Sequence, residues 1–116
     1  MRTIIVDQDE FEYSESEEQL EVAVATKGRR HHFPDVSSFC QSVREPSLAA
    51  PLPIPVEFEK LASAANIRAY LQRFAQVSLP QPCNWPTYVL SSDWDDVEVV
   101  IAGPAIHIHY HWWTTA

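Results

Sequence analysis

Glycine is scarce in this chain, which has only two glycines, Gly28 and Gly103, among its 116 residues. Glycine-rich loops form the backbone cradles that bind phosphate in nucleotide-binding proteins, so such a cradle is hard to build here. The sequence also contains no GxGxxG, P-loop or GxSxG pattern. We therefore predict that the protein is not an enzyme and has neither catalytic residues nor a bound cofactor.

Cysteine and long apolar runs are also in short supply. The two cysteines, Cys40 and Cys83, are too few for the disulfide framework of a small secreted domain. We interpret both as free thiols, with Cys83 the more exposed of the two. No stretch approaches the roughly 18 to 20 apolar residues of a membrane span, and we recognise no signal peptide. These features predict a cytoplasmic protein with no membrane partner.

Basic residues are outnumbered two to one, with 8 Lys and Arg against 16 Asp and Glu, for a formal net charge of −8. Proteins that bind nucleic acid directly obtain much of their affinity from cations that displace counterions from the phosphates. The charge balance therefore disfavours direct nucleic-acid binding. It favours a basic protein partner, which a negative field attracts and orients.

Two segments have the periodicity of amphipathic helices. Val36, Phe39, Cys40 and Val43 are spaced i, i+3, i+4, i+7 after Asp35, a residue suited to cap a helix. Four apolar residues after Ser63 have the same spacing: Ile67, Tyr70, Leu71 and Phe74. Residues 46–55 contain four prolines and predict an extended connector. Residues 56–61 fit either a strand or a first helical turn.

Strands are expected at both ends of the chain. Five segments are rich in β-branched residues or alternate apolar with polar or small residues, which is typical of strands. They are residues 2–6, 20–26, 88–90, 97–102 and 105–113. The last connections are too short for a parallel crossover, so they predict a C-terminal β-meander. The expected fold is α+β, one domain over residues 1–116. It has a mostly antiparallel sheet of about five strands, with the two amphipathic helices packed on one face.

The last expected strand alternates histidine with large apolar residues. Period-two geometry directs His107, His109 and His111 to one face and sets apolar residues such as Ile108 and Tyr110 on the other. One interpretation is that the histidines form the solvent or rim face of a half-buried strand. The alternative is a metal site, since imidazoles two residues apart can converge on one ion. Its remaining ligands would come from Asp93, Asp95 and Asp96 or from His31 and His32.

Negative charge is concentrated in two short segments. Residues 7–21 hold eight of the sixteen acids and residues 93–98 hold four more. Residues 10–14 fit either a short strand or a mobile acidic loop. If the first and last strands are neighbours, the two segments form one acidic surface with aromatic anchors. The candidate partner-binding residues are Phe11, Tyr13, Glu15, Glu17, Glu18, Asp93, Trp94, Asp95, Asp96 and Trp113.

These features together favour a small acidic inhibitor or immunity-type protein. Its acidic, aromatic surface would neutralise a basic protein, such as a nuclease toxin or another nucleic-acid-processing enzyme, by occupying a site built for phosphates. Two other hypotheses remain open. One is a metal-binding protein or metal-dependent enzyme that uses His107, His109 and His111. The other is a structural subunit in which Trp112 and Trp113 pack into an assembly.

Overall fold

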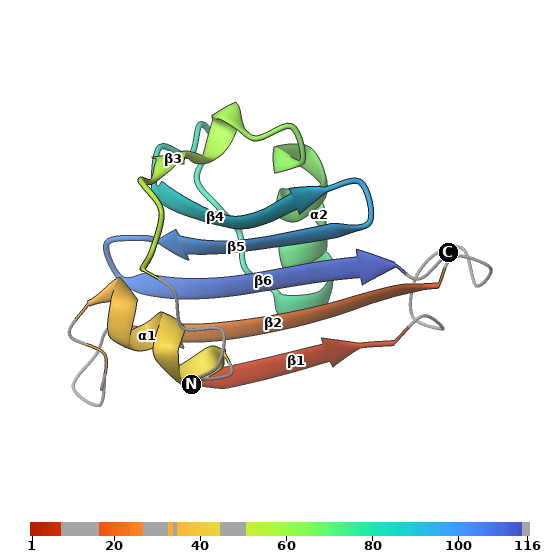
Figure 1. The fold of residues 1–116 in the computed structure, drawn as a ribbon, viewed down its shortest axis with the longest axis horizontal. Coiled ribbons are helices and arrows are strands. Elements are labelled where there is room, and N and C mark those ends of the chain that lie inside the picture. The colour runs from red at the N-terminus through yellow and green to blue at the C-terminus, as the bar shows by residue number, and fades with distance from the viewer. Residues whose placement is uncertain (8–16, 27–32, 34, 45–50, 115–116) are drawn as a thin grey trace.

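Six strands form one antiparallel sheet in the order β1-β2-β6-β5-β4-β3 (Figure 1). The computed structural model describes residues 1–7, 17–26, 33, 35–44 and 51–114. The predicted α+β class and antiparallel sheet are confirmed. The elements in chain order are β1 (Arg2–Val6), β2 (Glu18–Thr26), α1 (Val36–Val43), β3 (Val56–Glu57), the 3₁₀ helix η3 (Phe58–Lys60), α2 (Ala64–Ala75), β4 (Pro86–Asp93), β5 (Asp96–Ala102) and β6 (Ile106–Thr114).

The C-terminal meander is confirmed, because β4, β5 and β6 are neighbours in the sheet. The N-terminal pair of strands joins it through β6, whose Ile108 lies opposite Val24 of β2 and Ile101 of β5. The sheet has six strands where about five were expected, and β3 is only two residues long. Residues 56–61, which fitted either a strand or a helical turn, contain both: β3 is followed at once by η3.

Helix α2 covers one face of the sheet and forms the larger core. Its buried residues Ile67 and Leu71 belong to the same cluster as Leu20, Ile108 and Tyr110 from the central strands. The predicted apolar spacing is therefore the spacing that the helix uses. Burying each such side chain contributes about 1.5 to 3 kcal/mol to stability, so this cluster contributes most of the stability that the fold gains from apolar burial.

Helix α1 covers the opposite face, so the expectation that both helices pack on one face is wrong (Figure 1). Its buried Phe39 and Cys40 form a second cluster with Ala23, Ala25 and Val100. These strand residues alternate with those that face α2. Both alanines are small and let the helix approach the backbone closely. The central strands are consequently buried on both sides, as in a three-layer arrangement.

The start of α1 is capped by Asp35, as the sequence predicts. The Asp35 carboxylate accepts a hydrogen bond of 2.8 Å from the backbone N–H of Ser38, and the Ser38 hydroxyl accepts one from the Asp35 N–H. The backbone hydrogen bond from Ser38 holds the pKa of Asp35 below its ordinary value. This reciprocal capping box satisfies N–H groups that the first turn leaves without helical partners.

The end of α2 offers a direct test of backbone strain. Gln76 follows the helix in the left-handed conformation, with φ at 54°. A side chain is strained there, whereas glycine adopts this region freely. We expect Gln76→Gly to stabilise the protein by about 0.5 to 1 kcal/mol, after allowing for the added flexibility of the unfolded chain. Urea unfolding at neutral pH measures the change.

The matched control is the same substitution at Gln72, an exposed position within α2. There glycine replaces a residue in ordinary helical geometry, so Gln72→Gly should destabilise by about 1 kcal/mol. Effects of the same sign at both positions would contradict the argument.

Both cysteines are free and buried. The interpretation as free thiols is confirmed, but Cys83 is not the more exposed: its exposed fraction is 0%, against 8% for Cys40. Within the described ranges, no helix combines the length and apolar character needed to cross a bilayer.

Candidate functional site

The described residues Glu18 and Asp96, one from each acidic segment, lie at the same end of the sheet. Glu18 begins β2 and lies opposite Thr114 at the end of β6, while Asp96 begins β5 and lies opposite Trp113. The backbone N–H of Thr114 donates a hydrogen bond of 3.0 Å to the carbonyl of Asp95, which ties the β4–β5 turn to β6. The strand order therefore brings together residues that are far apart in the chain.

The sheet divides this end into two sides. Glu18 and Trp94 line a pocket on the α2 side, together with Asp93. Asp96 and Trp113 contact His111, in the row of residues that faces α1. The described candidate residues therefore lie on two sides of the sheet, some on the α2 side and others on the α1 side. Glu17 is exposed just before β2, and Phe11, Tyr13 and Glu15 lie outside the described residues.

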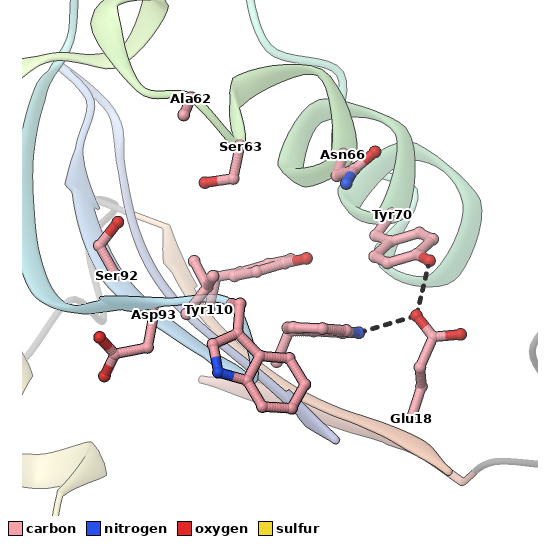
Figure 2. A pocket seen from close by; sticks show the side chains of 11 residues that line it. Glu18, Ala62, Ser63, Asn66, Tyr70, Ser92, Asp93 and Tyr110 are labelled. Atoms are coloured by element: carbon pink, nitrogen blue, oxygen red, sulfur yellow. Dashed lines mark hydrogen bonds between the residues drawn. The ribbon is translucent and has the colours of Figure 1, made fainter. Parts of the chain in front are cut away.

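The pocket lies between α2 and the end of the β4–β5 hairpin and has a volume of about 390 Å³ (Figure 2). Helix α2 and the turn before it supply one wall, β4 and the hairpin turn supply another, and β6 contributes the aromatic floor. Figure 2 shows the Tyr70 and Tyr110 hydroxyl groups on the inner side, between these elements. The lining residues are Glu18, Ala62, Ser63, Asn66, Tyr70, Ser92, Asp93, Trp94, Val97, Tyr110 and Trp112.

Glu18 is held at one end of this pocket by two donors. The Tyr70 hydroxyl of α2 donates a hydrogen bond of 3.2 Å to Oε1 of Glu18, and the Trp112 indole Nε1 of β6 donates one of 3.0 Å to the same oxygen. Figure 2 marks the bonds that converge on Glu18. These charge-assisted bonds orient the carboxylate from two different elements.

Tyr110 is a buried side chain with its polar end in the pocket. Only 2% of the residue is exposed, yet Figure 2 shows its hydroxyl directed into the space between α2 and β4. In the part of the chain that the structure describes, no hydrogen bond to this hydroxyl is found. Burial raises the pKa of Tyr110, and Tyr70 and Glu18 raise it further, so the phenol stays neutral.

The opposite face carries a buried ionic network formed by Arg44, Glu98 and His109. The Glu98 carboxylate accepts hydrogen bonds from Arg44 Nε at 3.0 Å and Arg44 Nη2 at 3.1 Å. Its Oε2 is also 2.7 Å from His109 Nε2. Burial alone would raise the pKa of Glu98, but the hydrogen bond from His109 and the charges of His109, Arg44 and His111 together lower it. The group is therefore an ionised, paired carboxylate.

Two of the three β6 histidines take positions different from those expected, whereas His111 is only partly buried, as the rim interpretation predicts. His107 and His109 are only 2% and 5% exposed, so the interpretation of a solvent or rim face is wrong for them. Helix α1 covers this row, and the ring of Phe39 lies 5.3 Å from that of His107, centroid to centroid. The signal that could have shown this is β2, where alanines occupy the positions between the valines and keep both faces apolar.

Two of the three β6 histidines pair with different carboxylates. His109 Nε2 points to Glu98, whereas His111 Nε2 lies 3.1 Å from Asp96 Oδ2. Trp113 packs on the His111 ring at 4.6 Å between centroids. Among the described residues, no three side chains of His, Cys, Asp or Glu are grouped so as to hold a metal ion.

Sequence reasoning missed the polar role of three pocket residues. Tyr70 and Tyr110 were placed on apolar faces, and Trp112 was placed among the apolar residues of its strand. The available signal was chemical, because a tyrosine or tryptophan at a core position needs a partner for its hydroxyl or indole N–H. Their common partner, Glu18, is distant in the chain, so only the fold identifies it.

The pocket has the chemistry of a binding site. It combines aromatic walls with a fixed carboxylate and hydroxyl groups, the few convergent polar groups that orient a ligand. Neither cysteine lines it: both are buried, and burial raises the pKa of Cys40. Comparison with known protein families, with curated proteins and with solved structures gave no match. Function must therefore be argued from the chain's own residues.

Proposed function

We propose that this protein is a small acidic inhibitor or immunity-type protein that binds a basic protein in the cytoplasm. The partner class that fits is a nuclease toxin or another nucleic-acid-processing enzyme. The observation that carries the proposal is that Glu18, at the start of β2, and Trp94, in the turn between β4 and β5, line the same pocket at one end of the sheet. Both residues were candidates for partner contact on sequence grounds alone.

The charges and aromatic residues at this end suit recognition of a basic surface. Asp93 and Glu17 are exposed there, and the chain as a whole carries a formal charge of −8. Such a field accelerates the encounter with a cationic partner and orients it. Trp94 is 77% exposed, which is unusual for a large apolar side chain in a protein that has a core available. Exposed tryptophan is a common anchor at the centre of protein interfaces.

The charges that line the pocket also favour a cationic ligand over an anionic one. Of the residues that line it in the described part of the chain, none is a lysine, arginine or histidine. An anionic ligand would therefore meet the Glu18 carboxylate and no cationic side chain of this described lining. A cationic group of a partner would instead be attracted, and an acidic protein of this kind would compete with nucleic acid for a phosphate-binding surface.

The proposal is tested by charge reversal at the acidic end. We expect Asp93→Lys to weaken binding of the captured basic partner about tenfold, which corresponds to about 1.4 kcal/mol, and Trp94→Ala to weaken it at least as much. The partner is first isolated on the immobilised protein from its host's lysate, with washes at low and high salt. The affinity of each variant is then measured by calorimetry with the purified partner.

The control is Glu57→Lys, which makes the same change in net charge. Glu57 is exposed on β3, at the far edge of the sheet from β2 and β6. The net charge changes equally in Asp93→Lys and Glu57→Lys. A difference between their affinities for the partner therefore reports the position of the charge and not the net charge. Equal losses in both, or no loss in Asp93→Lys and Trp94→Ala, would refute the assignment of this surface.

A further inference from the structure

Two polar groups in the pocket are positioned for a ligand that donates several hydrogen bonds. The Glu18 carboxylate is fixed at one end by Tyr70 and Trp112. The Tyr110 hydroxyl is directed into the same space (Figure 2). It is not one of the buried polar atoms left without a partner among the described residues, so it is accessible from the pocket, where a ligand can exchange a hydrogen bond with it.

We propose that this pocket binds one guanidinium group, the side chain of an arginine presented by a basic partner. The N–H groups of the guanidinium would donate to the Glu18 carboxylate and to the Tyr110 hydroxyl. Its flat faces would stack on the aromatic walls. The proposal rests on the proposed function, since it names the group of the basic partner that enters the pocket.

The pocket chemistry favours guanidinium over other groups. An anion would be repelled by Glu18 and would find no cationic side chain in the described lining. A neutral apolar side chain would cover the Tyr110 hydroxyl without forming a hydrogen bond to it, which is unfavourable. Guanidinium is planar, always charged and weakly hydrated, and it both pairs with carboxylates and stacks on aromatic rings. A volume of about 390 Å³ is at the lower end of the range for small-ligand pockets and suits one long side chain.

The test uses small probes and requires no partner. N-acetyl-arginine methylamide is titrated into the ¹⁵N-labelled protein, and N-acetyl-citrulline methylamide, which has nearly the same shape but no charge, serves as the matched probe. The indole N–H signal of Trp112 is the main readout because this group bonds Glu18 directly. We expect saturable shifts with the arginine probe and at least tenfold weaker binding of the citrulline probe.

Matched variants localise the binding. Glu18→Gln removes the charge and Tyr110→Phe removes only the hydroxyl, and each should weaken the arginine probe severalfold or more. Glu21→Gln is the control for charge, at an exposed position of the same strand. Tyr88→Phe is the control for the hydroxyl, since Tyr88 packs in the cluster beneath α1. Neither control should change the affinity.

The outcomes separate this inference from the proposed function. Equal binding of the two probes, full affinity in Glu18→Gln, or no shift with the arginine probe would overturn the arginine site. If partner capture still depended on Asp93 and Trp94 in that case, the inhibitor proposal would stand without it. Arginine binding that meets the criteria above, with no basic partner recovered, would support the pocket and count against the inhibitor proposal.

Discussion

Replacing Glu98 by alanine is expected to destabilise the protein by about 3 to 5 kcal/mol, the usual cost of breaking a buried ion pair from one side. The Arg44 guanidinium and the His109 ring would lose the carboxylate that their nitrogens now contact at 2.7 to 3.1 Å. Glu98 is also the contact through which the end of α1 is tied to the middle of the sheet. Urea unfolding at pH 7, followed by tryptophan fluorescence, measures the loss.

Two comparisons make this result specific. Glu21→Ala removes an exposed carboxylate from β2, which β6 separates from β5, and should stay within about 0.5 kcal/mol of the wild type. Glu98→Gln keeps the shape and one acceptor oxygen, so it should cost less than alanine. A loss below about 1 kcal/mol in Glu98→Ala would show that the network contributes no net stability.

The same carboxylate predicts a dependence on pH. The folded-state pKa of Glu98 lies below its ordinary value of 4.5, so the unfolded state binds protons first as the pH falls. The stabilisation from Glu98 is therefore complete above about pH 4.5 and is lost as the pH falls through the folded-state pKa. In Glu98→Gln this contribution is absent at every pH. The stability difference between the wild type and Glu98→Gln should thus narrow as the pH falls below about 4.5.

Replacing Phe39 by alanine is expected to cost a similar amount, about 3 to 5 kcal/mol. Its ring is fully buried and contacts the rings of Phe33 and His107, with centroids 5.6 and 5.3 Å away. Helix α1 has only eight residues, too few to be stable by itself, so it depends on this anchor. The loss should also speed amide hydrogen exchange in α1 more than in α2.

The control for this variant lies in the same helix. Gln41 is exposed, and Gln41→Ala should change the free energy of unfolding by less than about 0.5 kcal/mol. If Phe39→Ala were destabilised without faster exchange in α1, the anchor argument would be wrong. Unchanged stability in Phe39→Ala would likewise contradict the packing of α1 on the face of β6 that carries His107 and His109.

Local elements were largely predictable because their causes are local. The helix that begins after Asp35 follows from its capping residue and from the spacing of Val36, Phe39 and Val43. The meander follows from β-branched runs separated by connections too short for a crossover. Both kinds of signal involve residues within a few positions of each other, where backbone geometry and side-chain periodicity act directly.

The error about helix placement shows where this reasoning stops. Alternation in β6 correctly separated His107 and His109 from Ile108 and Tyr110. It could not say which face a helix would cover, because that depends on how α1 returns to the sheet. The histidine face of β6 was predicted to be exposed to solvent, but α1 packs on it. For that reason the buried pairing of His109 with Glu98 was not predicted.

For the candidate site, the amino-acid sequence alone determined the chemistry: the acidic segments, the position of Trp94 among acidic residues and the carboxylate of Glu18 are matters of composition and position. Only the tertiary structure decided which of them meet. The order β2-β6-β5 brings Glu18 to Trp112, and the approach of α2 brings Tyr70 to the same oxygen. The physical reason is that a pocket is made by elements distant in the chain, whose docking minimises exposed apolar surface for the whole molecule at once.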